Sequence, residues 1–368
     1  MIAGASLRDF RGYRDARVAL GNRLTVISGP NGAGKTNLLE ALYFGCTGHS
    51  CRTSNERELL RFGAHTARVE VDVEAEDGPH VLSVGFEPGT PKRMKVDGAS
   101  VERLLDVPGR PLVSVFLPDR LELIKGAPAL RRAHLDQFVA ALWPARAATR
   151  RAYSQALAQR NALLGRIRGG RGTRTALAPW DAQLAHHGVL LMADRVRAVD
   201  AVAKLFQRLA GELGLDGEPT LAYRPRSRAS TAAELAAELA ERAESDLERG
   251  FTGHGPHRDD LATLREGRDL RAFGSQGQQR LALLALLLAE REALAQVREA
   301  PPVMLLDDVM SELDDQRRRA LVELLRRGPG QAILTTTDLA HVPGAMDVEV
   351  VRLAVSAGRV LSASAVAA

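Results

Sequence analysis

The eight residues Gly29-Pro30-Asn31-Gly32-Ala33-Gly34-Lys35-Thr36 fit the pattern G-x4-G-K-[ST] in full. An apolar run typical of a buried strand, Leu24–Ser28, precedes them, and a helical stretch, Asn37–Phe44, follows. In this strand–loop–helix setting, glycines let backbone N–H groups surround phosphates. Lys35 brings a positive charge to the β- and γ-phosphates, and Thr36 offers a hydroxyl to Mg²⁺. The stretch therefore predicts a P-loop that binds ATP with Mg²⁺.

A second motif supplies the carboxylates that such a loop needs. The apolar run Val303–Leu306 ends in Asp307 and Asp308. We expect Asp307 on the metal side and Asp308 beside an attacking water, which makes both catalytic candidates together with Lys35. The alternative is an ordinary acidic turn after a buried strand, which the intact P-loop disfavours.

The third motif is Ser275-Gln276-Gly277-Gln278-Gln279-Arg280, directly before the apolar helix Leu281–Ala289. Ser275 is a typical N-cap residue, and Gly277 allows close approach to the backbone. The motif thus predicts a second anion site at a helix end. Because the P-loop already holds the phosphates, a second site indicates a nucleotide shared between two chains.

The apolar patterns predict α/β structure at both ends of the chain and helices in the middle. Expected strands outside the P-loop are Ala67–Glu76, His80–Phe86, Arg93–Val96, Pro111–Leu117, Val303–Asp307, Gln331–Thr337, Met346–Leu353 and Val355–Leu361. From Leu121 to about Gly250 strand signals largely stop. We expect one α/β head, split into residues 1–120 and 250–368, with an inserted helical arm at 121–249.

The helical arm is predicted to be compact. Apolar residues at helical spacing over Gln183–Leu213 and a capping box at Thr231–Glu234 indicate two helices. The longest uninterrupted pattern, Asp181–Gly214, would span only about 50 Å. No heptad pattern continues over many turns, so the arm is not a long coiled coil.

Composition excludes several classes of protein. The chain has 368 residues, 45% of them hydrophobic and 4% aromatic, and a formal net charge of +5. It has no apolar run long enough to span a membrane and no export signal at its start, and we expect a cytoplasmic protein. Its two cysteines, Cys46 and Cys51, read as reduced thiols, with a zinc site as the weaker alternative.

The positive charge is concentrated in one segment. Between Asp136 and Asp181 there is no acidic residue. The segment's basic residues are Arg146, Arg150, Arg151, Arg160, Arg166, Arg168, Arg171 and Arg174. This predicts salt-sensitive contacts with DNA phosphates, and without a base-reading motif we expect recognition of the backbone or of a junction shape. The alternative is an ordinary solvated helix face.

The sequence His254-Gly255-Pro256-His257-Arg258-Asp259-Asp260 invites a metal interpretation. Pro256 between the two histidines argues against a pair of ligands on one helix. We therefore favour a structural or nucleotide-side turn.

Together these motifs resemble an ABC-type ATPase head of the SMC-like branch. The stretches that match most narrowly are Gly29–Tyr43, Gly255–Leu261, Ser275–Arg280 and Leu305–Asp314, and the N-terminal stretch Leu7–Tyr13 supports the same branch. In this order they resemble the RecF family of bacterial recombination-repair proteins. The resemblance spans both halves of the chain, from about Leu7 to Thr337.

The resemblance implies an ATP-dependent head-to-head dimer that binds duplex DNA or junctions and helps to load recombinase at gaps. It implies a RecR-like mediator as partner and slow, DNA-stimulated ATP hydrolysis as a release switch. Ser275 and Gly277 would cap the γ-phosphate held by Lys35 of the other chain. The implied nucleotide-binding residues are Gly29, Pro30, Asn31, Gly32, Ala33, Gly34, Lys35, Thr36, Asn37, Ser275, Gly277, Gln278 and Asp314.

The chain departs from the wider ABC pattern in three places. Asp308 stands where most relatives have Glu, and its shorter side chain favours slow turnover. The stretch Phe116–Glu122, where a Mg²⁺-sensing Gln loop belongs, has no Gln. Asp338, in place of the switch His, follows the expected strand Gln331–Thr337, and His341 comes later.

Two other functions use the same motifs. The chain could be the ATP-binding subunit of a transporter, but Lys35 and Ser275 are 240 positions apart, much farther than is usual in transporter heads. A structural protein that binds ATP without hydrolysing it is the other alternative. Intact Thr36, Asp307 and Asp308 argue against it.

Overall fold

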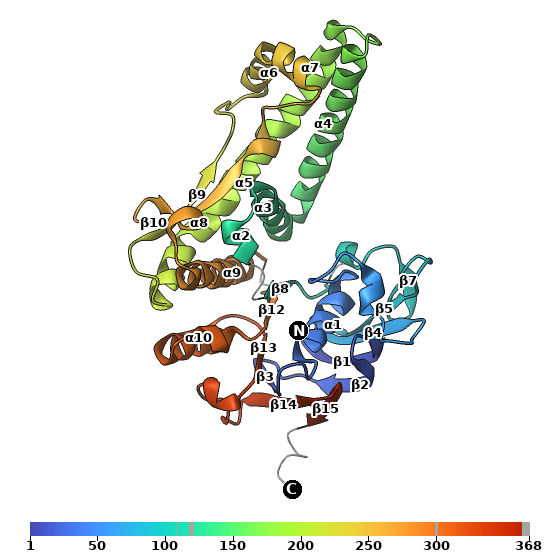
Figure 1. Cartoon of the computed structure of the whole chain (residues 1–368), viewed down its shortest axis with the longest axis vertical. Helices are drawn as coiled ribbons and strands as arrows, with labels where there is room; N and C mark the ends of the chain where they lie inside the picture. The colour runs from blue at the N-terminus through green and yellow to red at the C-terminus, as the bar shows by residue number, and fades with distance from the viewer. Residues whose placement is uncertain (108, 118–120, 299–300, 363–368) are drawn as a thin grey trace. The chain divides into compact units, whose positions relative to one another are not determined.

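The fold was analysed in a computed structural model that describes residues 1–107, 109–117, 121–298 and 301–362. The chain forms two compact units (Figure 1). The first combines both chain ends, residues 1–120 and 294–368, and the second comprises residues 121–293. The second unit thus continues past Gly250, where the sequence placed the end of the insertion, because the segment after Gly250 pairs with the helical arm through strand β10 (Asp260–Arg265).

A mixed sheet forms the centre of the first unit. In spatial order its strands are β15 (Arg359–Ser362), β14 (Val350–Ser356), β3 (Leu24–Ser28), β13 (Ala332–Thr336), β12 (Val303–Leu306) and β8 (Val113–Phe116). All neighbours are parallel except the β14–β15 hairpin. Nearly every residue of β3, β12 and β13 is buried, as expected for parallel strands covered on both faces.

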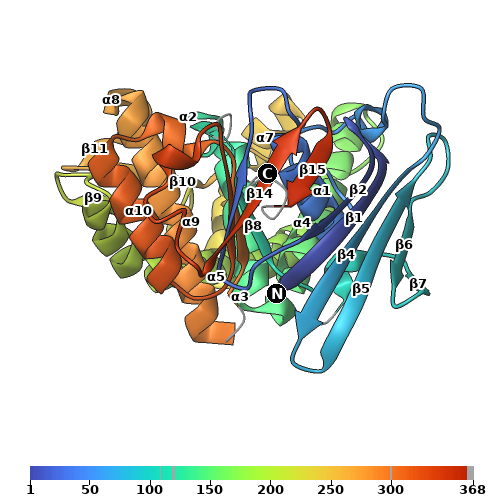
Figure 2. The ribbon, with the colours of Figure 1, turned by 90° about the horizontal axis from the view of Figure 1, so that it is seen from below.

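The second sheet of this unit is antiparallel and lies at the right of Figure 2. In spatial order its strands are β2 (Tyr13–Ala19), β1 (Ile2–Phe10), β4 (Ala67–Ala75), β5 (Gly78–Phe86), β6 (Arg93–Val96) and β7 (Ala99–Val101). Burial alternates along β4, which confirms the period-two pattern predicted there. The hairpin β1–β2 was not predicted, because Gly, Ala and Ser make β1 weak in strand propensity.

Helix α1 (Lys35–Thr47) packs between the two sheets and supplies much of the core. Its buried face includes Leu38, Leu42 and Phe44, which join the inner faces of both sheets in one apolar cluster. The remaining helical elements of the unit are η1 (Glu56–Leu59), η2 (Leu104–Asp106), η7 (Val309–Glu312), α10 (Asp315–Arg327) and η8 (Leu339–His341). The core therefore fixes the start of α1, where the P-loop ends.

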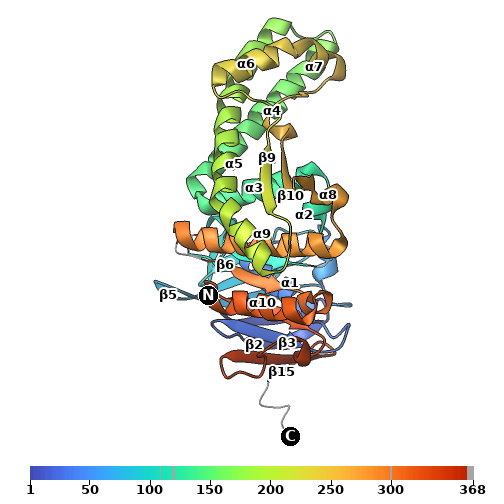
Figure 3. The ribbon, with the colours of Figure 1, turned by 90° about the vertical axis from the view of Figure 1, so that its left-hand side faces the viewer.

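The second unit is mainly helical (Figure 3). Its elements are α2 (Glu122–Lys125), α3 (Pro128–Leu142), η4 (Pro144–Arg146), α4 (Ala147–Arg168), η5 (Arg174–Leu177), α5 (Ala178–Glu212), β9 (Pro219–Arg224), α6 (Ala232–Glu241), α7 (Ala243–Arg249), η6 (Pro256–Arg258), β10 (Asp260–Arg265), β11 (Arg268–Asp269), α8 (Leu270–Phe273) and α9 (Gln276–Arg298), whose last turn crosses the unit boundary. The capping box at Thr231 is confirmed.

Two of the predictions for secondary structure need correction. The middle of the chain contains a strand, β9, which pairs with β10 and packs against α5. It begins with Pro219 and is an edge strand, so its sequence carries little strand signal. Strand β14 begins at Val350 rather than Met346, because the preceding residues, including the fully exposed Val348, form turns.

Candidate functional site: a P-loop and two terminal carboxylates

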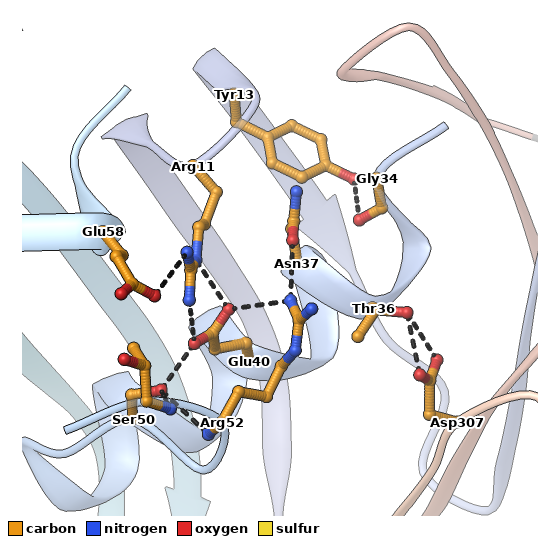
Figure 4. A network of polar contacts seen from close by, with 11 residues as sticks. Arg11, Tyr13, Gly34, Thr36, Asn37, Glu40, Ser50, Arg52, Glu58 and Asp307 are labelled. Atoms are coloured by element: carbon orange, nitrogen blue, oxygen red, sulfur yellow. Dashed lines mark hydrogen bonds and ion pairs between the residues drawn. The ribbon is translucent and has the colours of Figure 1, made fainter. Parts of the chain in front are cut away.

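The P-loop occupies the turn between β3 and α1, as predicted. Lys35 is buried, and its Nζ donates to the carbonyl oxygens of Gly29 and Pro30, at 2.7 and 3.0 Å. A Cβ at Gly29 would lie 2.2 Å from the carbonyl oxygen of Val355, so only glycine fits there. Gly34 has φ +114°, and its carbonyl accepts a hydrogen bond from the Tyr13 hydroxyl (Figure 4). The loop is thus held in the conformation of a phosphate cradle.

Thr36 and Asp307, the predicted metal-side pair, meet in the structure. Thr36 Oγ1 lies 2.9 and 2.8 Å from the two carboxylate oxygens of Asp307 (Figure 4). Thr335, at the end of β13, donates a hydrogen bond of 2.7 Å to Asp307 Oδ1. Hydroxyl and carboxylate oxygens are the donors that Mg²⁺ prefers, so these residues fit the ion. Thr335 is a site residue that the sequence analysis missed.

Asp308, two positions after the end of β12, has a strained conformation, with φ +44°. Its backbone N–H donates to Thr335 Oγ1, and its Oδ2 accepts from the Ser311 hydroxyl. Its Oδ1 is buried and, within the part of the chain that the structure describes, has no hydrogen-bond partner. A buried polar atom of this kind points to a ligand, because an unpaired oxygen costs free energy.

A polar network beside the P-loop also escaped the sequence analysis. Glu40, on α1, is fully buried, and it pairs with Arg11 at 2.9 Å and Arg52 at 3.3 Å (Figure 4). It accepts a further hydrogen bond from Ser50 Oγ. Arg52 also donates to the side chain of Asn37, one position after Thr36. A charged residue at an inward position of an apolar helix is the signal that identifies Glu40 in the sequence.

Ser275 caps α9 in the second unit. Its Oγ accepts from the backbone N–H of Gln278, and the Gln278 side chain accepts in return from the backbone N–H of Ser275. This reciprocal pair is a capping box, which confirms the predicted helix start. A Cβ at Gly277 would meet nothing closer than Ser275 Oγ at 4.0 Å, so the helix end is open. In the first unit, Asp314 caps α10 and pairs with Arg317.

The basic segment is only partly available for DNA. Arg160 was predicted to contact phosphates, and this is wrong: its side chain is fully buried in α4. It pairs with Asp181 and Asp246, both at 2.6 Å, and donates to Thr252. Arg160 thus holds α4, α5 and α7 together. Arg160 lies on the buried face of α4, because it is at helical spacing from the buried Tyr153.

The other arginines of the segment differ in their partners. Arg146 pairs with Asp194, Arg150 with Asp136 and Arg174 with Glu244, and Arg168 donates to the carbonyl of Arg249. Arg151, Arg166 and Arg171 are exposed, and the described residues give their side chains no partner. Those three, with Arg168, remain the best DNA candidates on this segment.

The histidine turn is a structural ion-pair cluster. His254 contacts Glu238 at 2.5 Å, and His257 donates through Nε2 to the carbonyl of Thr252. Asp259 is fully buried, where it accepts from Arg195 and Tyr223, and burial raises its pKa. Within the described ranges no group of three or more His, Cys, Asp or Glu side chains could hold a metal ion.

The remaining findings concern the thiols, the loop expected to sense Mg²⁺, and membrane spans. Cys46 lies in the core, where burial raises the pKa of its thiol to about 12, and neither Cys46 nor Cys51, both of which the structure describes, forms a disulfide. Of the loop expected to carry the Mg²⁺-sensing residue, Pro118, Asp119 and Arg120 lie outside the described residues. Among the helices that are described, none is long and apolar enough to cross a membrane.

Comparison with known proteins agrees with the site. Residues 6–105 match the family described as the AAA domain. The DNA replication and repair protein RecF of Anaeromyxobacter sp. (strain Fw109-5) is 39% identical over 349 residues, which cover 92% of each chain. The RecF of Chloroflexus aurantiacus is 36% identical over 390 residues, covering 97% of this chain and 98% of the relative. The chain belongs to the RecF family.

Solved structures extend this result to the fold. A RecF described as a recombination mediator protein of the RecFOR pathway, solved with ATP, superposes with a TM-score of 0.86 at 28% identity, over 98% of this chain and 97% of that one. An Smc head from Pyrococcus furiosus shares the fold, with a TM-score of 0.59 at 18% identity over 98% of this chain and 96% of that one. The RecF-family chain therefore has the predicted SMC-like ABC-type head with a helical insertion.

Proposed function

We propose that this chain is an ATP-dependent DNA-binding protein of recombinational repair and replication restart. It dimerises head to head when it binds ATP, holds duplex DNA or a junction, and releases it after slow hydrolysis. The observation that supports this most directly is the convergence of Thr36 and Asp307 beside an intact P-loop. The RecF structures solved with ATP point to the same nucleotide.

In the ATP-bound state, the residues of the P-loop take distinct roles. Lys35 exchanges its contacts with the Gly29 and Pro30 carbonyls for phosphate oxygens, which is a short movement of its ammonium group. Thr36 and Asp307 would hold Mg²⁺. The ion, when bound, supplies positive charge to the phosphates as negative charge shifts toward the leaving group. Asn37, whose side chain accepts a hydrogen bond from Arg52, directly follows Thr36.

Hydrolysis needs a base beside the γ-phosphate, and Asp308 is the residue we assign to it. Its Oδ2 is occupied by Ser311, which leaves Oδ1 to accept a proton from the attacking water. The strained backbone at Asp308 and the bond from its N–H to Thr335 fix its orientation. Because aspartate reaches less far than glutamate, we expect slow turnover.

Dimerisation follows from the open end of α9. Ser275 Oγ uses a lone pair to cap the helix, so its hydroxyl proton is free to be donated to a γ-phosphate. Gly277 leaves room for that phosphate at the positive end of the helix dipole. In our proposal this end caps the nucleotide held by Lys35 of a second chain. Asp314 then lies at the seam of the dimer.

We assign partners to this chain on the basis of its membership in the RecF family. Relatives are named as DNA replication and repair proteins, and the solved RecF structures belong to the RecFOR pathway. We therefore assign DNA and a RecR-like mediator as partners, recombinase loading at gaps as the outcome, and a nucleoid-associated cytoplasmic location. The exposed arginines Arg151, Arg166, Arg168 and Arg171 form the DNA contact on the second unit.

The test is steady-state ATP hydrolysis at low salt, with and without duplex DNA. We expect slow hydrolysis that rises when DNA is added, and none for Lys35→Met, which serves as the blank. An equal rate of ATP hydrolysis with and without DNA would contradict the DNA-gated function and would favour the transporter alternative. If the wild type hydrolyses no more ATP than the blank, the result would support the alternative of a structural protein that binds ATP without hydrolysing it.

A further inference from the structure

The outer face of the antiparallel sheet has a basic groove that the ATP site does not use. The groove has a volume of about 320 Å³, within the range of small ligand sites. Its lining includes four cations, Arg8, Arg68, Arg93 and Lys95, and a single carboxylate, Glu87. These residues lie on strands β1, β4 and β6 and on the turn that follows β5. The groove is therefore formed by several strands of the sheet together.

The pairing of the strands explains why the groove forms. Arg8 on β1 lies directly opposite Arg68 on β4, and Arg68 lies opposite Gly85 on β5. Gly85 in turn lies opposite Arg93 on β6. Because Gly85 has no side chain, the floor between Arg68 and Arg93 is open. Three neighbouring strand spacings of about 4.8 Å place Arg8 and Arg93 roughly 14 Å apart.

These cations are poorly neutralised within the protein. Like charges directly opposite each other on adjacent strands destabilise a sheet, and Arg8 and Arg68 are such a pair. Arg68 pairs with Glu70, and Arg93 with Glu87, in exposed ion pairs that contribute little. In the described part of the chain, the side chains of Arg8 and Lys95 have no partner. An external anion would relieve this repulsion.

Charge is divided along the same face. The basic residues occupy the end of the sheet where β1 turns into β2, and there the one carboxylate directly opposite Arg8 is Asp15 on β2. The opposite end carries Asp72 on β4, which lies opposite Val81, and Glu74. A polyanion is thus attracted to one end of the face and repelled from the other.

We propose that this groove binds the phosphate backbone of duplex DNA, as a second contact besides the exposed arginines of the second unit. The proposal rests on the DNA-binding function proposed above and adds a surface on the first unit. A row of guanidinium groups suits phosphates because each can bind an oxygen pair in a planar fork. A span of roughly 14 Å corresponds to about four base-pair steps of 3.4 Å. The row ends near the β1–β2 turn, where Tyr13 contacts the P-loop through Gly34.

A matched pair of variants tests the groove by filling it. In Gly85→Gln a side chain is built into the floor, and it fits because its Cβ would meet Arg93 at 3.8 Å, an ordinary contact. Val81→Gln places the same side chain on the same face of β5, four positions away, outside the groove. Affinity for a labelled DNA duplex is measured by fluorescence anisotropy over a series of salt concentrations, together with ATP binding.

Gly85→Gln should weaken DNA binding several-fold at low salt and leave ATP binding unchanged, while Val81→Gln should bind DNA like the wild type. The double variant Arg8→Gln, Lys95→Gln should lower the slope of log affinity against log salt by about 0.9 for each phosphate that is no longer neutralised. If the wild type binds DNA and all these variants match its affinity and slope, the groove proposal is overturned. A wild type that binds no duplex DNA would overturn the proposed function itself.

Discussion

Thr36 and Asp307 are 271 positions apart in sequence, yet the Thr36 hydroxyl lies within hydrogen-bond distance of both carboxylate oxygens of Asp307. Thr36 ends the P-loop and Asp307 directly follows strand β12, so the two halves of the split head meet at this contact. Its geometry can form only when β12 and β3 stand in the same sheet, separated by β13. The contact thus reports that the head is correctly assembled.

We predict that Asp307→Asn weakens Mg²⁺-dependent ATP binding about 10- to 100-fold, as is typical when a residue that orients a metal's shell is removed. The amide keeps the size of the side chain and the bond from Thr335 but removes the negative charge. Thr36→Ser is the control, because it keeps the hydroxyl. Titration of Mg²⁺ against binding of a fluorescent ATP analogue measures the effect. Equal Mg²⁺ dependence in Asp307→Asn and wild type would remove Asp307 from the metal site.

Asp308→Asn should bind ATP, lose the base and remain as an ATP-bound dimer. Hydrolysis should fall by about 100-fold or more, in line with loss of a general base. Sedimentation after addition of ATP should show a dimer that persists in the variant and decays in the wild type. A variant that hydrolyses ATP at the wild-type rate would show that another residue activates the water.

Ser275→Arg should bind ATP as a monomer. The arginine removes the hydroxyl and places a bulky side chain at the N-terminal end of α9. In our proposal this helix end caps the nucleotide that a second chain holds. Loss of the cap costs about 1 kcal/mol of stability, too little to unfold the protein. Ser275→Thr keeps the hydroxyl and the cap, so it should dimerise with ATP. A Ser275→Arg chain that sediments as a dimer with ATP would exclude capping across the seam.

Arg160→Met should destabilise the protein by about 3–5 kcal/mol, because Asp181 and Asp246 would stay buried without their cation. Arg166→Met, on the exposed face of the same helix, should change stability by no more than about 0.5 kcal/mol. Urea denaturation of both variants measures the difference. Equal stabilities would mean that the buried network does not stabilise the second unit.

The stability of the protein should fall in acid partly through His257. Burial lowers the pKa of His257 to about 4, whereas an unfolded histidine titrates near 6.5. The unfolded state therefore binds more protons between these values, and stability decreases as pH falls from about 6.5 to 4. The neighbouring cations Arg132 and Arg258 oppose protonation, while Asp246 favours it.

His257→Gln should flatten this part of the pH dependence by roughly 3 kcal/mol. Urea denaturation at both ends of the window measures it. His65→Gln, at an exposed position, is the control and should keep the wild-type pH dependence. An unchanged dependence in His257→Gln would assign the acid sensitivity to other groups.

Local motifs made the nucleotide site predictable. The P-loop, the strand before Asp307 and the cap at Ser275 each depend on a few consecutive residues, and the structure has all three where the sequence indicated them. The same holds for the alternation along β4. Residues with distant partners were missed. The partners of Thr335 and Glu40 are distant in sequence, and only Glu40, a charged residue at an inward position of an apolar helix, has a local signal.

Arg160 shows how a charge count can mislead. The absence of nearby acidic residues suggested a free cation, but its partners Asp181 and Asp246 come from other helices. The buried residues Tyr153, Ala156, Arg160 and Leu164 follow each other at spacings of three and four. This helical spacing places Arg160 on the inner face of α4, so periodicity was a better guide than charge.

The position of β3 between β13 and β14 sets the order in which the chain can fold during its synthesis. Strand β3 ends at Ser28, whereas β13 begins at Ala332, about 300 residues later. At bacterial translation speeds of about 5–20 residues per second, that interval lasts roughly 15–60 s. During it, the apolar edges of β3 have no neighbour, while the second unit can already fold. The central sheet of the head thus cannot close until its last strands emerge.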